Sequence, residues 1–236
     1  MPPILSVVLP AYNEEANLER AVRGSASVVA SLVEDYELVV VDDGSRDGTE
    51  RILTRLAEEM NTHLRVVRHP ENRGYGAALR TGFQAARGEL IFYTDSDNQF
   101  DLRELRGFLP LMREWDAVIG YRMDRQDPFF RRFVSGCYNL LASSAFGMSV
   151  RDLNCSFKLF RREAVQTLLL KSDNFFIDTE LMVRLHRAGW RYIQRGVHHY
   201  PRTAGRSTVR FSDVPRTFLA LARVWLEIRL TRSKGK

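Results

Sequence analysis

The sequence contains little cysteine and little lysine. Its two cysteines, Cys137 and Cys155, stand too far apart for a Cys-x-x-Cys device, and no histidine at metal-ligand spacing accompanies them. A disulfide-rich secreted domain is therefore excluded, and a reduced, cytoplasmic setting is the default expectation. Only four of the 35 basic residues are lysines, so arginine carries the positive charge, and arginine is suited to phosphate.

The sequence also shows no targeting or membrane-spanning pattern. Residues 1–3 run directly into an apolar, strand-like segment, without the basic region, hydrophobic region and cleavage site of a secretory signal. The longest uncharged stretch, residues 133–150, is interrupted by serine, glycine and asparagine, which makes it a poor bilayer helix. We therefore expect no transmembrane segment.

The remaining composition is that of a folded domain. A chain of 236 residues with 44% hydrophobic residues can bury a core of its own. The 35 basic and 29 acidic residues give a net charge of +6. Because the arginines are spread along the chain and no motif combines base stacking with basic residues, we expect no nucleic-acid partner.

The first half of the sequence alternates between buried strands and amphipathic helices. Runs of mostly apolar residues, typical of parallel strands covered on both faces, stand at residues 4–9, 37–41, 64–67, 90–93 and 117–120. A helical pattern follows each of the first four after a short loop, and one of these helices is expected over residues 102–112. Asn13 is expected to cap the first helix. This order predicts an α/β domain with a largely parallel sheet.

An acidic turn, residues 95–99, follows the fourth apolar run. Asp95 and Asp97 would stand at the end of a buried strand, where a parallel sheet opens its ligand crevice. Hard oxygen donors there suit Mg²⁺ or Mn²⁺, and Gln99 could add a neutral oxygen. The same turn could instead only cap a helix that begins near Asp101, and the turn alone leaves both interpretations open.

Acidic residues also follow the second strand, at Asp42 and Asp43. A carboxylate in this position can accept a hydrogen bond from a ribose hydroxyl or a base N–H, whereas the alternative is a plain Asp-Gly turn. With Asn13 and Glu14 after the first strand, these side chains would gather at one edge of the sheet.

The sequence from Gly74 to Gly76 resembles a dinucleotide-binding fingerprint only superficially. Leu79 replaces the third glycine, and the motif follows the third strand, so we expect no NAD site. The small residues are expected to let this helix approach the sheet or a nucleotide closely.

The second half of the sequence has a different character. Residues 127–146 are aromatic and basic, and such a helix could belong to the core or lie on a membrane face with Arg131 and Arg132 near lipid phosphates. Residues 152–160 are expected to form a strand that returns to the site. The loop at 201–208 carries two arginines, as do loops that close over anionic ligands. The amphipathic helix expected at 214–230 could dock on the core or on a membrane surface.

Taken together, these motifs resemble family 2 glycosyltransferases of the GT-A fold, and within them the polyprenyl-phosphate, dolichyl-phosphate mannose synthase-like branch. The resemblance covers most of the chain and rests on residues 8–15, 40–49, 72–74 and 95–101 and on the arginine loop at 202–208. It implies one glycosyltransferase domain over residues 1–212, with a nucleotide-binding half (1–120) and an acceptor half (121–212). An amphipathic helix and a basic tail would follow at 213–236.

The resemblance also assigns roles to residues. The implied nucleotide-sugar-binding set is Pro10, Tyr12, Asn13, Glu14, Val41, Asp42, Asp43, Gly74, Asp95, Ser96 and Asp97. Mg²⁺ or Mn²⁺ would be bound by Asp95, Asp97 and Gln99. The metal would neutralise the departing nucleoside diphosphate, while in-line attack at the anomeric carbon inverts the configuration.

The identity of the acceptor decides what else the site needs. A sugar hydroxyl requires a general base, for which Asp178 or Glu180 is placed as in many family members. A lipid phosphate, with a second pKa of about 6, is already anionic and needs arginines instead. The residues expected at an acceptor phosphate are Arg122, Arg131, Arg202, Arg206 and Ser207. Asp97, Asp178, Glu180 and Arg206 form the expected catalytic set.

The leading expectation is a metal-dependent, inverting enzyme that moves a hexose from a nucleotide sugar of the GDP-mannose or UDP-glucose type to dolichyl or undecaprenyl phosphate. Such an enzyme would lie at the inner face of the membrane, where it could meet a membrane protein partner. Two alternatives stay open: a family member with a hydroxyl acceptor, and a scaffold that binds nucleotide sugar without turnover.

Overall fold

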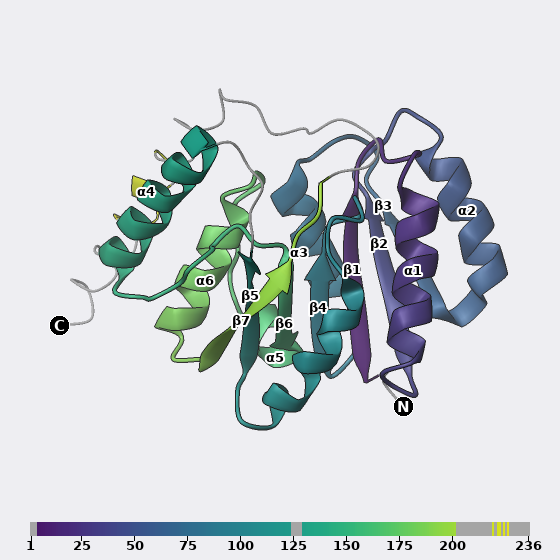
Figure 1. The fold of residues 1–236 in the computed structure, drawn as a ribbon. Helices are drawn as coiled ribbons and strands as arrows, with labels where there is room; N and C mark the ends of the chain where they lie inside the picture. The colour runs from purple at the N-terminus through teal and green to yellow at the C-terminus, as the bar shows by residue number, and fades with distance from the viewer. Residues whose placement is uncertain are drawn as a thin grey trace.

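A seven-stranded sheet with helices on both faces forms the body of the protein (Figure 1). The structure is a computed structural model, and it describes residues 4–123 and 129–201. Near the C-terminus it also describes the helical residues Leu219, Leu221, Ala222, Val224 and Leu226. In residues 129–133 it describes the helical backbone but not the side chains.

The strand order combines a parallel sheet with one reversed strand. The strands are β1 (Leu5–Ala11), β2 (Tyr36–Asp42), β3 (Leu64–Arg68), β4 (Leu90–Thr94), β5 (Ala117–Met123), β6 (Phe157–Arg161) and β7 (Tyr192–His198). Their spatial order is β3-β2-β1-β4-β6-β5-β7. All neighbouring pairs are parallel except those of β6, which runs antiparallel to β4 and to β5. The predicted α/β architecture with a largely parallel sheet is confirmed.

Helices cover both faces of this sheet. The α-helices are α1 (Leu18–Ala30), α2 (Thr49–Met60), α3 (Tyr75–Ala85), α4 (Phe129–Phe146), α5 (Arg162–Gln166) and α6 (Ile177–Arg187). Three 3₁₀ helices are described as well: η1 (Asn61–His63), η2 (Leu102–Gly107) and η3 (Leu109–Arg113).

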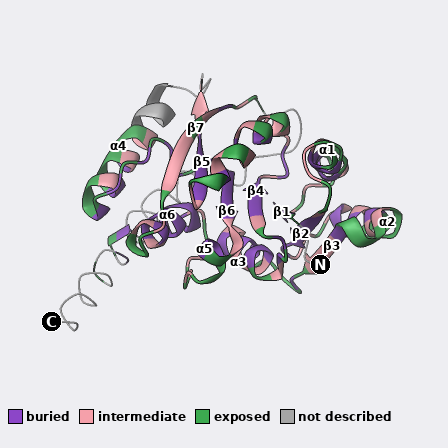
Figure 2. Ribbon diagram, turned by 90° about the horizontal axis from the view of Figure 1, so that it is seen from below, coloured by how far each residue is buried: buried purple, intermediate pink, exposed green. Residues whose placement is uncertain are grey.

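Each central strand buries side chains on both of its faces. On β1, Val7 and Leu9 belong to the core cluster that includes residues of α1, α2, η2 and η3, whereas Val8 belongs to the cluster that includes residues of α3, α5 and α6. Figure 2 shows α1 on one side of the sheet and α3, α5 and α6 on the other. Because both faces are covered, the strands need no polar alternation, and this explains the mostly apolar runs of the sequence.

The second half of the chain adds α4 at the end of the molecule, beyond α6 (Figure 1). Tyr138 and Ala142 of α4 belong to the core cluster of the α3–α6 face, and so do Leu221 and Val224 of the C-terminal helix. The expected docking of this last helix on the core is confirmed for these two residues. No helix in the described part of the chain has the length and apolar character needed to cross a membrane.

Asn13 does not cap the first helix, which corrects one local expectation. Helix α1 begins at Leu18, and Asn13 has a positive φ of 53° in the loop before it. Its side-chain oxygen accepts a hydrogen bond from Arg46 N (2.8 Å), and its own N–H donates to Ser45 Oγ (2.9 Å). Asn13 therefore ties the loop after β1 to the loop after β2.

Two further local expectations were wrong. The helix expected over residues 102–112 is divided into η2, which ends at Gly107, and η3. Pro110 has no N–H to donate to the preceding turn, so a continuous α-helix does not form here. The strand expected from Asp152 begins only at Phe157. Residues 152–155 form a turn instead, closed by a hydrogen bond from Cys155 N to Asp152 O (3.4 Å).

Candidate active site

The site lies where the strand order reverses. The chain proceeds from β1 to β2 on one side, while β4 pairs with β1 on the other, and ligands of such sheets bind outside the carboxyl ends of the strands at this point. The acidic turn at 95–99 is fixed there. Ser96 Oγ donates to Pro10 O (2.9 Å), and Asn98 Nδ2 donates to Asn17 O (3.1 Å).

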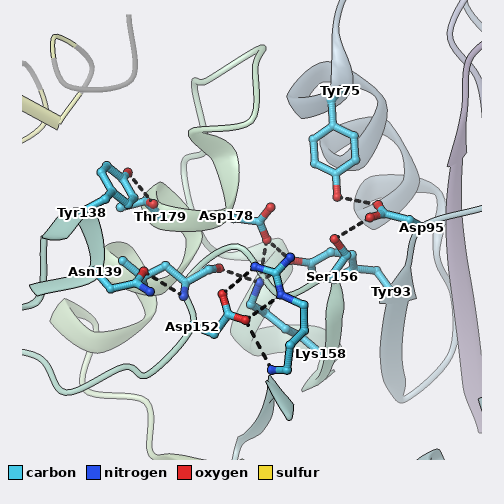
Figure 3. Close-up of polar contacts among 12 residues, drawn as sticks. Tyr75, Tyr93, Asp95, Tyr138, Asn139, Asp152, Ser156, Lys158, Asp178 and Thr179 are labelled. Carbon is cyan, nitrogen blue, oxygen red and sulfur yellow. Dashed lines mark hydrogen bonds and ion pairs between the residues drawn. The ribbon is translucent and has the colours of Figure 1, made fainter. Parts of the chain in front are cut away.

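Asp95 is held by two hydroxyl groups from different elements (Figure 3). Its Oδ1 accepts from the Tyr75 hydroxyl of α3 (3.0 Å), and its Oδ2 accepts from Ser156 Oγ just before β6 (2.7 Å). Burial, followed by the charge of Asp97, raises the pKa of Asp95 to about 7. Burial and the Asp95 charge raise the pKa of Tyr75 well above 10, so its hydroxyl stays protonated and donates.

The donor atoms of this turn fit a hard divalent cation. The charge of Asp97 contributes to the raised pKa of Asp95, and a bound cation would offset that repulsion. Gln99 Nε2 donates to Tyr200 O (2.8 Å), which leaves its amide oxygen as the atom for a ligand. Among the described residues, no group of three or more His, Cys, Asp or Glu could hold a metal. Mg²⁺ commonly takes one or two carboxylates and completes its shell with phosphate and water.

Asp43 organises the loop that precedes α3. Its buried carboxylate accepts from His69 Nδ1 (2.6 Å), Arg73 N (2.9 Å) and Gly74 N (2.8 Å). The other ring nitrogen of His69 lies 2.9 Å from Thr81 Oγ1. Asp42 is likewise buried, and its Oδ1 accepts from Ser45 N (3.0 Å). Both carboxylates shape the loops at this edge of the sheet.

Glycines at the start of α3 and within it allow a close approach of neighbouring segments. Gly74 has a φ of 97°, and a Cβ there would lie 2.2 Å from Asp173 O. A Cβ on Gly76 would lie 2.2 Å from Ser172 O, and on Gly82 2.4 Å from Val8 Cγ1. Small residues therefore bring α3 against the sheet, as expected, and also against the loop at 171–175.

The other expected nucleotide-site residues lie at the ends of β1 and β2. Pro10 and Val41 are buried within these strands, whereas Tyr12 is half-buried just after β1. Glu14 N donates to Thr49 Oγ1 (2.9 Å), and Glu14 Oε2 accepts from Asn17 Nδ2 (2.8 Å). The predicted gathering of these side chains at one edge is confirmed by the strand order.

Glu180 has a structural role in the loop before α6. Its buried carboxylate accepts from Lys171 N (3.0 Å), Ser172 N (2.8 Å) and Arg184 Nε (2.7 Å). Burial acts to raise the pKa of Glu180, but hydrogen bonds from Ser172, Arg184 and Lys171 outweigh it, and the pKa is lowered. Glu180 therefore holds a fixed negative charge that fastens the loop at 171–172.

Asp178 belongs to a buried ion pair (Figure 3). Its Oδ1 accepts from Lys158 Nζ (2.6 Å) and from the Tyr93 hydroxyl. Lys158 is fully buried in β6, and Nζ also donates to Tyr93 Oη (2.7 Å) and Leu153 O (3.0 Å). Asp178 and Glu180 thus hold different groups, although they stand two residues apart at the start of α6.

Of the arginines expected at an acceptor phosphate, the structure places one side chain. Arg122 donates from Nε to Asp152 Oδ2 (2.7 Å) and from Nη2 to Asp152 Oδ1 (2.9 Å), a bidentate pair. The side chain of Arg131 and residues Arg202, Arg206 and Ser207 lie outside the described residues. The phosphate-binding role of all five residues stays a prediction, and so does the domain boundary at 212.

Sequence reasoning missed Tyr75, Tyr93, Ser156 and Lys158. A tyrosine at a helix start or in a strand, or a serine beside a strand, gives no signal of its own. Lys158 does, because it stands inside the apolar run at 157–160, and a charge in a run of that kind must find a partner in the core. Its partner, Asp178, is 20 residues away in sequence, so the pairing needs the fold.

The sequence model of glycosyl transferase family 2 matches residues 6–169. The chain belongs to this family. It is 36% identical over 208 residues to the Glycosyltransferase AglD of Haloferax volcanii, covering 84% of this chain and 33% of the relative. It is 30% identical over 211 residues to an undecaprenyl-phosphate 4-deoxy-4-formamido-L-arabinose transferase of Shewanella sediminis, covering 89% and 63%. The chain thus spans about one third of the length of the first relative and less than two thirds of the length of the second.

Solved structures agree with this family 2 fold. Glucosyl-3-phosphoglycerate synthase of Mycobacterium tuberculosis, in complex with Mn²⁺, UDP and glucosyl-3-phosphoglycerate, aligns with a TM-score of 0.70 at 21% identity, over 93% of this chain and 80% of that one. The same enzyme with Mg²⁺ and UDP gives a TM-score of 0.69. The expected GT-A fold and the resemblance to the polyprenyl-phosphate branch of family 2 are confirmed.

Proposed function

We propose that this chain is the catalytic domain of a metal-dependent, inverting glycosyltransferase that moves a hexose from a nucleotide sugar to a polyprenyl phosphate. The observation that carries the choice of acceptor is the engagement of both candidate bases. Asp178 is paired with Lys158, and Glu180 is fastened to two backbone N–H groups and to Arg184.

A general base must take up a proton in the transition state. Protonation of Asp178 would leave the buried ammonium of Lys158 without its counter-ion, at a cost of about 3–5 kcal/mol for a broken buried pair. Glu180 has a lowered pKa, and its carboxylate oxygens already accept hydrogen bonds. A phosphate acceptor removes this difficulty, because it attacks as an anion and needs no base.

The donor side of the proposal rests on the acidic turn. Asp95, Asp97 and Gln99 would hold Mg²⁺ or Mn²⁺, which supplies positive charge to the departing nucleoside diphosphate. Ser96 and Asn98 keep these ligands in place through their bonds to Pro10 and Asn17. The solved neighbours that contain UDP with Mn²⁺ or Mg²⁺ are consistent with such a site. The donor would be of the GDP-mannose or UDP-glucose type.

The acceptor side combines the relatives with the arginines of the sequence. Enzymes similar to this chain are named undecaprenyl-phosphate 4-deoxy-4-formamido-L-arabinose transferase, and the name is consistent with undecaprenyl phosphate as an acceptor. We expect Arg131, Arg202, Arg206 and Ser207 to contact the acceptor phosphate. Arg122 would join them only by sharing its guanidinium with Asp152.

Transfer of label to lipid tests this proposal. Purified protein is incubated with undecaprenyl phosphate, Mg²⁺ or Mn²⁺, and each of a panel of labelled GDP- and UDP-sugars. At least one donor should give organic-extractable label, and Asp97→Asn should abolish it. Asp101→Asn is the matched control, since that carboxylate pairs with Arg103 outside the proposed metal turn, residues 95–99. No lipid-extractable label from any donor would refute the function.

We further propose that α4 lies on the cytoplasmic face of an anionic membrane. Leu140 is 69% exposed and Leu141 52% exposed, and Cys137 and Ala145 are exposed on the same helix. Figure 2 shows α4 at the end of the molecule with an exposed outer side. Basic residues 131–132 precede this uncharged surface, and a basic, amphipathic helix of this kind binds anionic headgroups.

Vesicle sedimentation tests the membrane proposal. The protein should bind phosphatidylglycerol vesicles more strongly than phosphatidylcholine vesicles, and Leu140→Glu with Leu141→Glu should weaken the binding. Leu169→Glu is the control, because Leu169 is equally exposed, at 69%, but follows α5. Equal binding by the α4 variant and the control would contradict the proposal.

A further inference from the structure

Lys158 joins three segments of the chain at one buried point. An ammonium group has three N–H donors, and each one of Lys158 has an acceptor from a different element. These acceptors are Tyr93 Oη of β4 (2.7 Å), Leu153 O of the turn before β6 (3.0 Å) and Asp178 Oδ1 of α6 (2.6 Å). Because the side chain is fully buried, no water can replace a lost acceptor without a change in packing.

Two of these segments are bonded to α4 by neighbouring residues (Figure 3). Asn139 Nδ2 donates to Arg151 O (3.0 Å), and Asn139 Oδ1 accepts from Leu153 N (3.3 Å). Tyr138 Oη and Thr179 Oγ1, which is beside Asp178, lie 2.7 Å apart in the core. The position of α4 is therefore fixed through the same turn and the same helix start that Lys158 holds.

The third segment leads to the metal turn. Tyr93 lies on β4, two residues before Asp95. Its hydroxyl accepts a hydrogen bond from Lys158 and donates one to Asp178. Ser156, which donates to Asp95 Oδ2 (2.7 Å), lies two residues before Lys158. A shift of Lys158 would thus displace Asp95, through Tyr93 on β4 and through Ser156 before β6.

We propose that Lys158 is a positioning residue that fixes α4 relative to the metal turn, so that the acceptor phosphate and the nucleotide sugar are held in the relative positions that transfer requires. The inference rests on the proposed function, in which α4 meets the lipid phosphate. Lys158 contacts neither substrate in this account. It acts through Tyr93, Leu153 and Asp178, and its loss should affect use of the acceptor more than binding of the metal.

The first test replaces the ion pair by neutral groups of similar size, Lys158→Met with Asp178→Asn, so that no buried charge is left unpaired. In a folded double variant, we expect the KM for undecaprenyl phosphate to rise about tenfold, while acceptor-independent hydrolysis of the nucleotide sugar stays within about threefold of wild type. Loss of folded protein alone would lower both activities in proportion. An unchanged acceptor KM in the folded double variant would overturn the proposal.

Asn139→Ala provides a second variant at the half-buried end of the network, in case the double variant does not fold. It should raise the acceptor KM without changing donor hydrolysis. Ser143→Ala, one turn later on α4, is the matched control, because the Ser143 hydroxyl has no hydrogen-bond partner among the described residues. Equal acceptor KM values in the two variants would overturn the proposal.

Hydrogen exchange separates this inference from the function on which it rests. In the wild type, Mn²⁺ alone should slow amide exchange in residues 151–155. In Asn139→Ala it should not, although residue 139 is remote in sequence from the metal turn. Equal effects of Mn²⁺ in both proteins would contradict the positioning role whatever the acceptor is. A wild type that transfers no sugar to lipid would instead refute the proposed function.

Discussion

Lys158 Nζ lies 2.6 Å from Asp178 Oδ1, and the exposed fractions of the two side chains are 0% and 4%. A buried pair of this kind costs desolvation energy and adds little net stability compared with apolar residues. We therefore infer that the pair, which lies close to the acidic turn at 95–99, serves to position the segments that it joins. The same pair engages Asp178 Oδ1, and this engagement is the basis of our proposal that the acceptor is already an anion.

Asp178→Asn should destabilise the protein strongly, because it leaves the Lys158 ammonium buried without a counter-ion. We expect a loss of about 3–5 kcal/mol in the free energy of unfolding, with Lys158→Met restoring part of it in the double variant. Urea denaturation measures both values. A double variant no more stable than Asp178→Asn would show that the charge is not the cause.

Glu180→Gln should also destabilise the protein, in a pH-dependent way. The pKa of Glu180 is lowered in the folded state, so its stabilising effect is present above its unfolded pKa of 4.5 and is lost as the pH falls through the folded value. The stability difference from wild type should therefore be large near neutral pH and shrink in acid. Thermal unfolding across pH measures this difference.

Exposed Glu163→Gln on α5 is the control for Glu180→Gln and should change little at any pH. Glu180→Gln also tests the structural role that we assign to Glu180. Its pH–rate profile for transfer should keep the shape of the wild-type profile, and loss of the acidic limb would identify Glu180 as the base after all.

Metal binding should depend on pH through Asp95. Its pKa is raised from 3.8 to about 7 by burial and by Asp97, so the folded metal-free protein holds the extra proton between these values. The metal-free protein should therefore lose stability as pH rises from about 4 to about 7. A metal needs the ionised carboxylate, so Mn²⁺ should raise the Tm more at about pH 8 than at about pH 6.

Differential scanning fluorimetry with and without Mn²⁺ measures this dependence. Asp95→Asn should remove both the metal effect and the loss of metal-free stability toward neutral pH, whereas Asp101→Asn should retain them. An increase in Tm that is the same at both pH values would speak against Asp95 as a ligand.

Gly76→Ala should destabilise the junction between α3 and the loop at 171–175. The added Cβ would lie 2.2 Å from the backbone oxygen of Ser172, and the N–H of Gly76 is bonded to Asp173 O (2.9 Å). We expect a loss of about 1–3 kcal/mol, the usual cost of overpacking. Gly24→Ala on α1 has nothing within 4 Å and should instead stabilise the helix by about 0.5–1 kcal/mol. Equal effects of the two changes in chemical denaturation would contradict this packing.

Most of the architecture follows from local sequence patterns. Runs of mostly apolar residues mark the central strands because both faces of the sheet are covered, and the acidic and glycine-rich loops mark their carboxyl ends. The position of β6 between β4 and β5 does not follow from such patterns, because pairing of strands distant in sequence is decided by packing. The division of residues 102–113 into η2 and η3 could have been found, since Pro110 stands inside the expected helix.

The site was predictable where chemistry is concentrated in short motifs. Asp95 and Asp97 could be proposed as ligands because the acidic turn stands beside the other family 2 motifs of the sequence, although the turn alone is equally compatible with a helix cap. Their supports could not be predicted, since Tyr75 and Ser156 come from elements that the sequence does not place together. The roles of Asp178 and Glu180 likewise depend on partners that only the fold supplies, namely Lys158 and the backbone at 171–172.

The choice between acceptors is tested most directly by two lipids that differ only in the phosphate. Wild-type protein is supplied with its nucleotide sugar, Mg²⁺, and either undecaprenyl phosphate or undecaprenol in equal amounts. Because neither Asp178 nor Glu180 is available as a base, label should pass to undecaprenyl phosphate and not to the alcohol. Equal transfer to undecaprenol would contradict the account, since a hydroxyl acceptor would then require a general base other than Asp178 and Glu180.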